Sequence, residues 1–265
     1  VLTKRVRRRN RLFMAGLCVG VVAMFFSLLL HEAAGDSGSE TVGRIMGLPM
    51  VIGIVTGMVV GGLLPVLETV FGVTTDVSWL ELADLNHPLM RRLSIEAPGT
   101  YHHSLVVANL SEAAAERIGA SASMCRVSSY FHDIGKLSKP EYFIENMDPS
   151  ANPHEDLTPR MSALVIIAHV KDGVDIAIKN NLNSRIIDVI EQHHGTSMAY
   201  YFYRQALDQK AEMEKLVRQG KAKEDDVPQV SEETFRYPGP KPQFKEAAII
   251  SIADAVESSS RTLEK

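Results

Sequence analysis

Two long apolar runs open the chain. Residues 12–30 and 47–67 contain no Asp, Glu, Lys or Arg, and both are rich in Leu, Val, Met and Gly. A helix needs about 20 apolar residues to cross the hydrocarbon core of a bilayer. Glycine is tolerated in such helices because it lets neighbouring helices approach closely. The pattern therefore predicts a membrane region at residues 1–72, with two transmembrane helices at about 12–30 and 47–67.

The charges beside these runs predict their orientation. Lys and Arg crowd residues 4–11, whereas the loop at 31–46 holds three acidic residues and one Arg. The positive-inside rule then places everything after the second run on the cytoplasmic side of the membrane, in a multi-pass protein. A cleaved signal peptide is the alternative, and the length of the first run and the second run close behind it disfavour cleavage. Because the chain opens on Val1 with a basic flank, further membrane helices are expected upstream.

The pattern changes from continuous to periodic after residue 72. Residues 73–92 mix apolar and charged positions and are predicted to be a juxtamembrane linker. From 93 to 265, apolar residues recur at the three- and four-residue spacing of amphipathic helices, with turn signals between the repeats. The predicted helices cover 100–118, 123–134, 158–170, 184–194, 198–219 and 243–263. No alternating run indicates a sheet, so the predicted class is all-α: a helical domain facing the cytoplasm, preceded by two transmembrane helices.

Composition excludes some functions. The net charge is −4 and charged residues make up 23% of the chain, so there is no global basic footprint of the kind that duplex nucleic acid binding needs. No duplex nucleic acid is therefore expected as a partner. The two cysteines, Cys18 and Cys125, form neither a disulfide framework nor a CxxC metal motif, which favours a reducing compartment.

The helical domain carries histidines and aspartates that an ordinary core would avoid. His132 and Asp133 stand side by side at the end of an apolar stretch, where unpartnered ionisable groups are costly to bury. Neighbouring residues on a helix point about 100° apart, so one doublet can offer a ligand to each of two ions. Imidazole and carboxylate suit Zn, Mn or Fe, so the set predicts a site for two divalent transition-metal ions with Asp133 between them. The candidate ligands are His103, His132, Asp133, His169, His193, His194 and Asp254.

Taken singly, several of these positions have ordinary explanations. His169 is compatible with a core histidine, the pair at 193–194 with an exposed helix end, and Asp254 with a surface acid. The doublet at 132–133, followed by Gly and Lys, is more specific for a site. Of His102 and His103 only one can face inward, and the prediction takes His103.

These residues also carry a resemblance to a known family. The ordered set His103, His132–Asp133 and Asp254 is similar to the H…HD…D signature of the HD-domain metal-dependent phosphohydrolases. The segments "YFHDIGKLSKPEYFIENM", "EQHHGTS" and "FRYPGPKPQFKEAAIISIADAVE" resemble the seven-transmembrane HD family of cyclic-di-AMP phosphodiesterases. The resemblance covers about residues 80–265 plus the two preceding spans. The related class that acts on cyclic-di-GMP carries a GYP motif after its His pair, and "HHGTSMAYYFYRQ" has none.

The resemblance implies a fold, a reaction and a division of the ligands. It implies a helical HD bundle that hydrolyses cyclic-di-AMP to linear pApA and so lowers the level of a second messenger, with Mn or Fe as the first candidates for the metal. One ion would be held by the positions His103, His132, Asp133 and Asp254. The other would be held by Asp133, His169, His193 and His194. The densely charged stretch at 210–230 is longer than the family pattern. The resemblance therefore defines the ligands but not the path by which a substrate reaches them.

A mechanism follows as a hypothesis. A hydroxide shared by two ions would attack phosphorus in line, with Asp133 as the central catalytic carboxylate. Lys136 is the candidate for a phosphate-binding cation near the reaction, and Arg236 in the Pro-rich turn is a weaker candidate for binding substrate. The alternatives are an HD phosphohydrolase for another nucleotide (a dNTP, an alarmone or cyclic-di-GMP) and a non-catalytic nucleotide-binding membrane receptor. Lipid contact through the two spans is expected, and a homodimer is left open.

Overall fold

A computed structural model of the chain describes residues 10–34, 39–71, 74–148 and 150–263. The chain divides into two compact units, Val1–Ala83 and Asp84–Lys265. Each unit is described by itself. The boundary lies inside the stretch predicted as a linker. This stretch contains the short helix α3 (Asp76–Leu82) of the first unit and the start of α4 (Pro88–Glu96) of the second.

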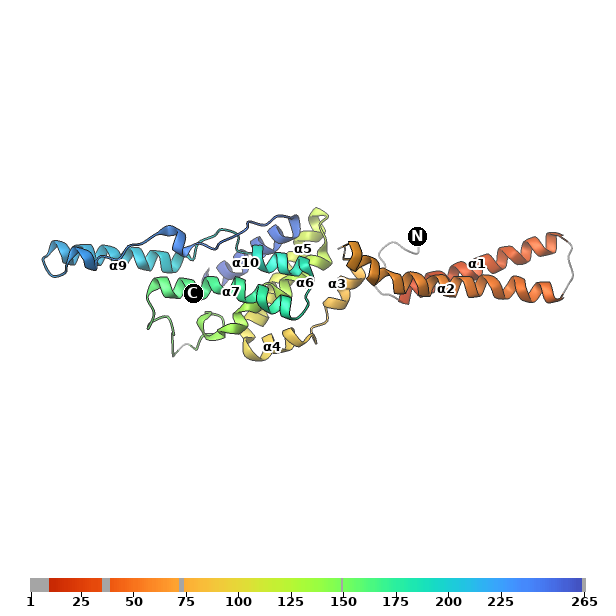
Figure 1. Cartoon of the computed structure of the whole chain (residues 1–265), viewed down its shortest axis with the longest axis horizontal. Coiled ribbons are helices and arrows are strands. Elements are labelled where there is room, and N and C mark those ends of the chain that lie inside the picture. Colours follow the sequence, from red (N-terminus) through yellow and green to blue (C-terminus); the bar gives the residue numbers. More distant parts are fainter. Residues whose placement is uncertain (1–9, 35–38, 72–73, 149, 264–265) are drawn as a thin grey trace. The chain divides into compact units, whose positions relative to one another are not determined.

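The first unit is built on a pair of long helices that lie side by side, α1 (Asn10–Ala34) and α2 (Ser39–Phe71) (Figure 1). Glycines line their contact: a Cβ on Gly16 would lie 2.5 Å from the carbonyl oxygen of Gly53, and one on Gly53 would lie 2.8 Å from the Cα of Gly20. Such contacts let two backbones touch, as in packed membrane helices. Large apolar side chains such as Phe25, Phe26 and Val59 point outward and are exposed.

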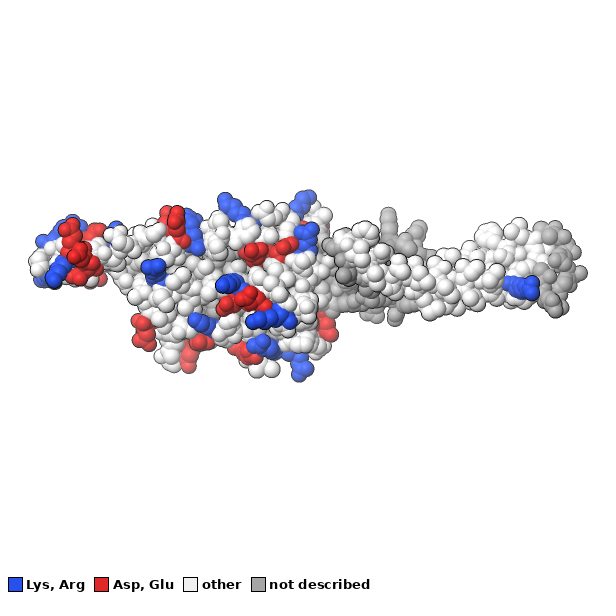
Figure 2. Space-filling model, viewed as in Figure 1, with Lys and Arg blue, Asp and Glu red and all other residues white. Residues whose placement is uncertain are grey.

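Two segments in this unit, Met14–Glu32 and Gly43–Glu68, are long and apolar enough to cross a membrane by length and composition. They overlap both predicted spans, which confirms that two helices of membrane-spanning length and composition precede the helical domain. On the face shown in Figure 2, the described part of these helices carries almost no charged side chains, whereas basic and acidic side chains are interspersed over the second unit.

The regular elements of the second unit are all helices: its described residues contain no strand and a single isolated bridge between Met198 and Arg236. The all-α prediction is therefore confirmed. Its longer elements after α4 are α5 (Pro98–Ile118), α6 (Ala122–Phe131), α7 (Pro159–Lys179), α8 (Ser184–Gln192), α9 (Tyr200–Arg218) and α10 (Lys245–Leu263), with 3₁₀ turns η1 (Ile134–Ser138), η2 (Pro140–Tyr142), η3 (Glu224–Asp226) and η4 (Glu232–Phe235).

Local signals explain several helix ends. The side chains of Ser121, Thr158 and Asn183 accept hydrogen bonds from backbone N–H groups in the first turns of α6, α7 and α8. Gly119 ends α5 in the left-handed conformation at φ 70°, which glycine adopts without a Cβ penalty. The helix predicted to end at residue 170 continues to Lys179. The helix predicted at 123–134 stops at Phe131, where the chain tightens into η1.

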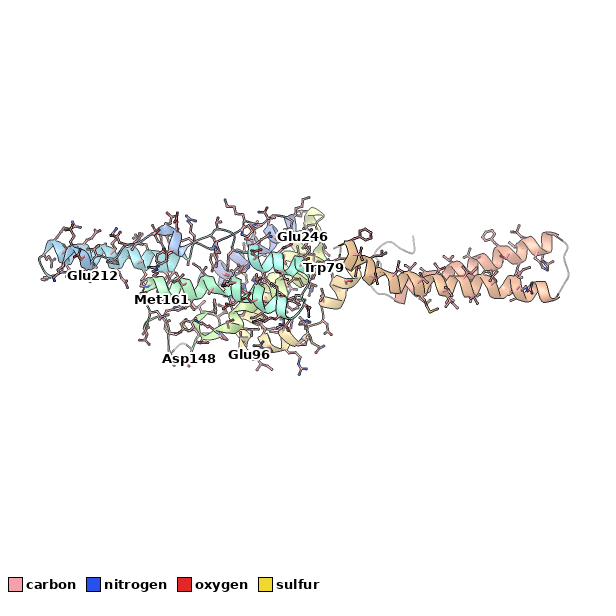
Figure 3. The ribbon with its side chains drawn as sticks, in the orientation of Figure 1. Trp79, Glu96, Asp148, Met161, Glu212 and Glu246 are labelled. Atoms are coloured by element: carbon pink, nitrogen blue, oxygen red, sulfur yellow. The ribbon has the colours of Figure 1, made fainter. Side chains whose placement is uncertain are left out.

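Packing brings distant segments together. α5 packs against α6 and α10, and α7 packs against η1, α8 and α9. One core cluster joins Val107 of α5, Val189 of α8 and Ile250 of α10, all fully buried. Within this unit the first turns of α9 pack against α7 and η4, and the rest of α9, which carries Glu212, extends beyond the other helices (Figures 1 and 3).

Candidate metal centre

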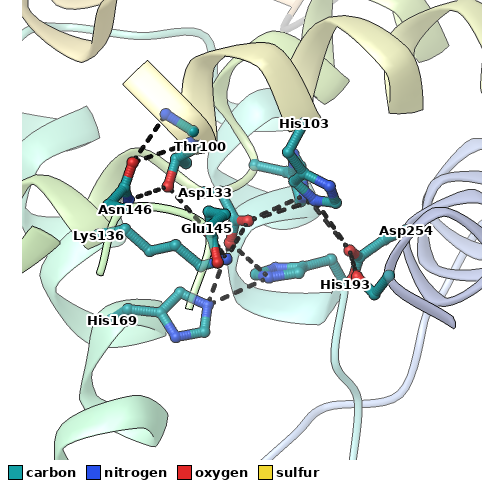
Figure 4. Close-up of polar contacts among 12 residues, drawn as sticks. Thr100, His103, Asp133, Lys136, Glu145, Asn146, His169, His193 and Asp254 are labelled. Carbon is teal, nitrogen blue, oxygen red and sulfur yellow. Dashed lines mark hydrogen bonds and ion pairs between the residues drawn. The ribbon is translucent and has the colours of Figure 1, made fainter. Parts of the chain in front are cut away.

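The seven predicted ligands come together in the core of the second unit. They arrive on α5, on the junction of α6 and η1, on α7, at the end of α8 and on α10 (Figure 4). The ligand atoms fall into two groups, each with all its atoms within 4.8 Å of one another. The first group is His103, His132 and Asp254, and the second is Asp133, His169, His193 and His194. Every member except His194 is buried.

The doublet His132–Asp133 owes its geometry to the end of α6. His132 is still helical, with φ −57° and ψ −32°, while Asp133 has left the helix, with φ −109° and ψ 17°. The change in backbone direction lets both side chains turn inward. Gly135, two residues later, makes the closest backbone approach in this region, because a Cβ there would lie 1.8 Å from the carbonyl oxygen of His169. Only glycine lets η1 lie directly on α7, and this contact brings His169 beside Asp133.

Hydrogen bonds determine which ring nitrogen of His132, His169 and His193 faces the cluster. The Nδ1 atoms of His132 and His193 lie 2.8 Å and 2.7 Å from the carbonyl oxygens of Ser129 and Ile190. His169 makes the same contact to the carbonyl three residues before it. A carbonyl oxygen only accepts, so each Nδ1 carries the hydrogen, and each Nε2 presents its lone pair to the interior.

These lone pairs face one another in the second group. The Nε2 atoms of His169 and His193 are 3.4 Å apart, and Asp133 Oδ1 lies 3.3 Å and 3.5 Å from them. Three acceptors at such distances repel one another unless a cation lies between them. The Nε2 atoms of His103 and His132 and the Oδ1 atom of Asp133 are buried with no hydrogen-bond partner. The arrangement therefore fits a bound cation.

The other oxygen of Asp133 serves the first group. Asp133 Oδ2 lies 3.5 Å from His103 Nε2 and 3.4 Å from His132 Nε2, and Asp254 Oδ1 lies 3.1 Å from His103 Nε2. Two ligands about 2.1 Å from one ion, at tetrahedral or octahedral angles, are roughly 3.0–3.4 Å apart. The observed spacing is close to these values in both groups. One carboxylate is therefore shared between two ion-sized clusters of donors.

Known families match both parts of the chain. The family described as "HD domain" matches residues 100–259, a range that contains all seven donors. The chain belongs to the HD-domain family. The family described as "7TM receptor with intracellular HD hydrolase" matches residues 1–75. Together with the two apolar helices, this second match indicates that the HD domain is part of a membrane protein.

Two bacterial proteins are similar to this chain over nearly its whole length. The cyclic-di-AMP phosphodiesterase PgpH of Bacillus subtilis (strain 168) is 44% identical over 257 residues, which are 96% of this chain and 34% of the relative. The PgpH of Listeria monocytogenes serotype 1/2a (strain 10403S) is 41% identical over 264 residues, which are 99% of this chain and 34% of the relative. The chain therefore spans about a third of the length of these curated relatives.

A solved structure shares the fold of the second unit. It is the L. monocytogenes PgpH HD domain in complex with cyclic-di-AMP, with a TM-score of 0.57 and 47% sequence identity. The match covers 67% of this chain and 75% of that chain. Metal dependence is a property of the HD family, and the donor cluster of this chain could bind metal.

The electrostatics of the HD domain suit metal binding. Burial alone would raise the pKa of Asp133, but the Lys136 ammonium and the nearby imidazoles outweigh it and hold that pKa well below its ordinary value. Burial, with His193 and His169 beside it, holds the pKa of His194 well below its ordinary value, although its side chain is 24% exposed. Ionised carboxylates and neutral imidazoles are the protonation states that bind metals.

Lys136, predicted to be a cation near the reaction, is in direct contact with one of the candidate metal ligands. Its Nζ is 2.7 Å from Asp133 Oδ2 and 2.8 Å from Glu145 Oε1. Burial would lower the pKa of this ammonium, but the two carboxylates outweigh it and raise the pKa. Glu145 is itself held by the Thr100 hydroxyl at 2.9 Å. The lysine is thus an ionised group clamped beside the shared carboxylate.

Arg236 is placed differently. It is exposed, and its guanidinium contacts the Glu232 carboxylate and donates to the carbonyl oxygen of Thr196 at 3.0 Å. Its neighbour Tyr237 is buried instead, with its ring centroid 4.3 Å from that of His194 and 6.0 Å from that of His169. The structure therefore brings Tyr237, and not Arg236, against the donor cluster.

Sequence reasoning missed two acidic residues of this site. Glu257 is buried and accepts from Nδ1 of His103, so His103 is oriented by a carboxylate and not by a backbone carbonyl. The signal was readable, because Glu257 follows Asp254 by three residues and shares its helix face. Glu145 gave no such signal, since it lies in an irregular loop and reaches Lys136 only through the tertiary fold.

Proposed function

We propose that this chain is the catalytic part of a bacterial inner-membrane phosphodiesterase that opens cyclic-di-AMP to linear pApA and lowers its cellular level. The observation that supports it best is the division of Asp133, whose two carboxylate oxygens face two separate groups of nitrogen and oxygen donors. A pair of divalent ions in these groups would supply an activated water and neutralise charge on the phosphoryl oxygens. The names of the PgpH relatives favour cyclic-di-AMP as the substrate.

We assign one ion to His103, His132, Asp133 and Asp254, and the other to Asp133, His169, His193 and His194, with Mn or Fe as the metal. The short contacts among their Nε2 and carboxylate atoms support this division. Each imidazole is held by a hydrogen bond on its far nitrogen or by ring packing, so its lone pair is oriented before an ion arrives.

The remaining roles concern the substrate. Asp133 is the central catalytic carboxylate, because both groups depend on it. Lys136 is proposed to contact the scissile phosphate: its ammonium is ionised, buried and adjacent to Asp133, and Glu145 prevents it from swinging away. Arg236 stays a weaker substrate-binding candidate, since its guanidinium would first have to leave Glu232 and the Thr196 carbonyl.

The domain organisation completes the proposal. Residues 1–72 form a lipid-contacting membrane region, 73–92 a juxtamembrane linker and 93–265 an HD domain in the cytoplasm. The basic flank before the first span supports this orientation.

The test is product identification with the purified chain in detergent. With Mn²⁺, cyclic-di-AMP should be converted to pApA, and cyclic-di-GMP, a dNTP and an alarmone should be turned over more slowly. Preference for one of the other nucleotides would replace the substrate assignment. Binding of nucleotide without turnover, with both metals loaded, would leave a receptor in place of an enzyme.

A further inference from the structure

The Pro-rich turn before α10 is fastened to the segment that follows α8. The N–H of Ala199 donates to the carbonyl of Phe235 at 2.8 Å. The N–H of Tyr237 donates to the carbonyl of Ser197 at 2.9 Å. These two bonds hold the main chain on both sides of Arg236. The place of Tyr237 beside the end of α8 is therefore set by the backbone and does not depend on its own side chain.

Alternation along this segment explains why Tyr237 and not Arg236 faces the donor cluster. Arg236 is extended, with φ −96° and ψ 144°. In an extended chain, successive side chains point to opposite sides. Phe235 and Tyr237 therefore share the inward side, and both are buried. The ring of Phe235 fills an apolar cluster between α7 and α9, whereas the ring of Tyr237 lies against His194.

Tyr237 lies where the donor cluster is most open to solvent. The side chain of His194 is 24% exposed, that of Asp254 is 9% exposed, and those of the other five candidate ligands are at most 4% exposed. The ring of Tyr237 covers His194, with centroids 4.3 Å apart and planes inclined by 32°. The most accessible route from solvent to the cluster therefore passes these two rings.

The hydroxyl of Tyr237 has no partner within the described part of the chain. Tyr237 is only 8% exposed, yet its hydroxyl makes no hydrogen bond with any residue that the structure describes. Buried tyrosine hydroxyls usually have a partner, because an unpaired polar group is costly to bury. A phenylalanine would pack on His194 equally well, so packing does not account for the hydroxyl. A polar group of a bound ligand would supply the missing partner.

The hydroxyl is close enough to the cluster for the charges there to act on it. Burial raises the pKa of Tyr237 above its ordinary value, and the Lys136 ammonium lowers it. The carboxylates of Asp133 and Asp254 raise the pKa further. Such interactions weaken with distance, so the hydroxyl lies near the shared carboxylate. The raised pKa keeps the phenol a neutral O–H donor, which suits an anionic oxygen.

We infer that Tyr237 is a catalytic residue whose hydroxyl donates a hydrogen bond to a non-bridging oxygen of the scissile phosphate at the metal centre. The inference rests on the proposed function. In-line attack on phosphorus increases the negative charge on these oxygens, so the hydrogen bond is stronger in the transition state than in the bound substrate. Loss of the hydroxyl should therefore lower kcat more than it raises KM.

The test is Tyr237→Phe in the full chain loaded with Mn²⁺, with steady-state kinetics on cyclic-di-AMP. The substitution keeps the ring on His194 and removes only the hydroxyl. We expect kcat to fall at least about tenfold, which corresponds to about 1.4 kcal/mol, and KM to change by less than about threefold. The Mn²⁺ content should stay at the wild-type value.

The matched control is Tyr203→Phe. The ring of Tyr203 packs on Phe235, with centroids 5.5 Å apart, and its hydroxyl also makes no hydrogen bond with the described residues. This variant loses the same atom on the other side of the turn, away from the donors. Its kcat, KM and Mn²⁺ content should equal those of the wild type.

Inorganic phosphate gives a second readout that needs no turnover. Its oxygens carry more charge than those of a diester, so they accept a stronger hydrogen bond. Calorimetric titration of the Mn²⁺-loaded chain with phosphate should show at least about threefold weaker binding for Tyr237→Phe and no change for Tyr203→Phe. The inference requires both the lower kcat and the weaker phosphate binding, and the absence of either would overturn it.

Two further outcomes separate a structural role and the proposed function from this inference. Loss of Mn²⁺ in Tyr237→Phe would show that the residue acts by holding His194, which would overturn a contact with phosphate. If the wild-type chain turns over another nucleotide faster, the proposed substrate fails, and kcat on that nucleotide tests Tyr237 in the same way. If no nucleotide is turned over, the proposed function fails and phosphate affinity alone decides: weaker binding in Tyr237→Phe would support the inference, and equal binding would overturn it.

Discussion

The two halves of the donor cluster are built differently. In the half formed by His169, His193 and His194, two of the imidazoles are oriented by backbone carbonyls three residues earlier, so the helix itself sets their tautomer. In the other half, His132 is oriented in the same way by the carbonyl of Ser129, but His103 is oriented by a side chain, the carboxylate of Glu257 on α10, which Arg261 in turn contacts. Asp133 is common to both.

The difference shows where each half is vulnerable. Backbone acceptors cannot be removed by substitution, so the His169 half depends on the packing that brings α7 and α8 to η1. The His103 half depends on one buried carboxylate that a single substitution deletes. A change at Asp133 should therefore affect both ions. A change in packing should affect the ion of the His169 half and also lower stability. A change at Glu257 should affect only the ion of the His103 half.

The largest effect is expected for Asp133→Asn. The amide fills the same volume and can donate to a neighbouring Nε2, so the helices should remain, but the charge that holds both ions is lost. Activity should fall by more than about 10³-fold, beyond the cost of deleting one electrostatic contact. Metal analysis and circular dichroism on the same sample check the two parts of the prediction. A variant that keeps two ions per chain would contradict the sharing of Asp133.

Gly135→Ala should break the contact between η1 and α7. The added Cβ would lie 1.8 Å from the His169 carbonyl oxygen, where backbone cannot yield. Unfolding free energy should fall by roughly 3 kcal/mol or more, as in strongly overpacked cores. Gly119→Ala is the control, because nothing lies within 4 Å of its Cβ and only the left-handed conformation, at roughly 1–2 kcal/mol, opposes it. Equal losses in urea denaturation would contradict the packing argument.

Glu257→Ala should weaken one ion site and spare the other. Loss of a carboxylate that orients a metal-binding histidine reduces metal affinity by about 10–100-fold. Equilibrium dialysis with Mn²⁺ should show one tight and one weakened site. Glu257→Gln keeps an acceptor for Nδ1 of His103, so its loss should be smaller. Two equally weakened sites would mean that the halves are not independent.

The smallest effect is expected from removing the side chains that accept hydrogen bonds at the first turns of α5 and α8, the helices that position His103 and His193. Asn146 accepts from the N–H groups of Gly99 and Thr100 at the start of α5, and Asn183 accepts from Arg185 at the start of α8. Substituting either by Ala should cost about 1 kcal/mol of stability. Metal affinity should change by less than about twofold in both variants. A selective loss of one ion in Asn146→Ala would show that its loop, and not only Glu257, orients the first half.

How far the sequence could predict this molecule varies with the element. The apolar runs at 12–30 and 47–67 and the helical periodicity after 93 predicted the class, because burial and period act locally. The end of α6 at Phe131 was missed, since periodicity continues through His132 while the Gly135 contact that tightens the chain is tertiary. The same holds for the cluster: the residue types were readable, but Glu145 and Tyr237 reach it only through the fold.

The most direct test of the central claim is the number of Mn²⁺ ions bound by the purified chain, with electron paramagnetic resonance to detect coupling between them. Two ions per wild-type chain with a coupled spectrum, and loss of both in Asp133→Asn, are the expected result. One ion or none in the wild type, or two ions that Asp133→Asn leaves in place, would contradict a centre that shares this carboxylate.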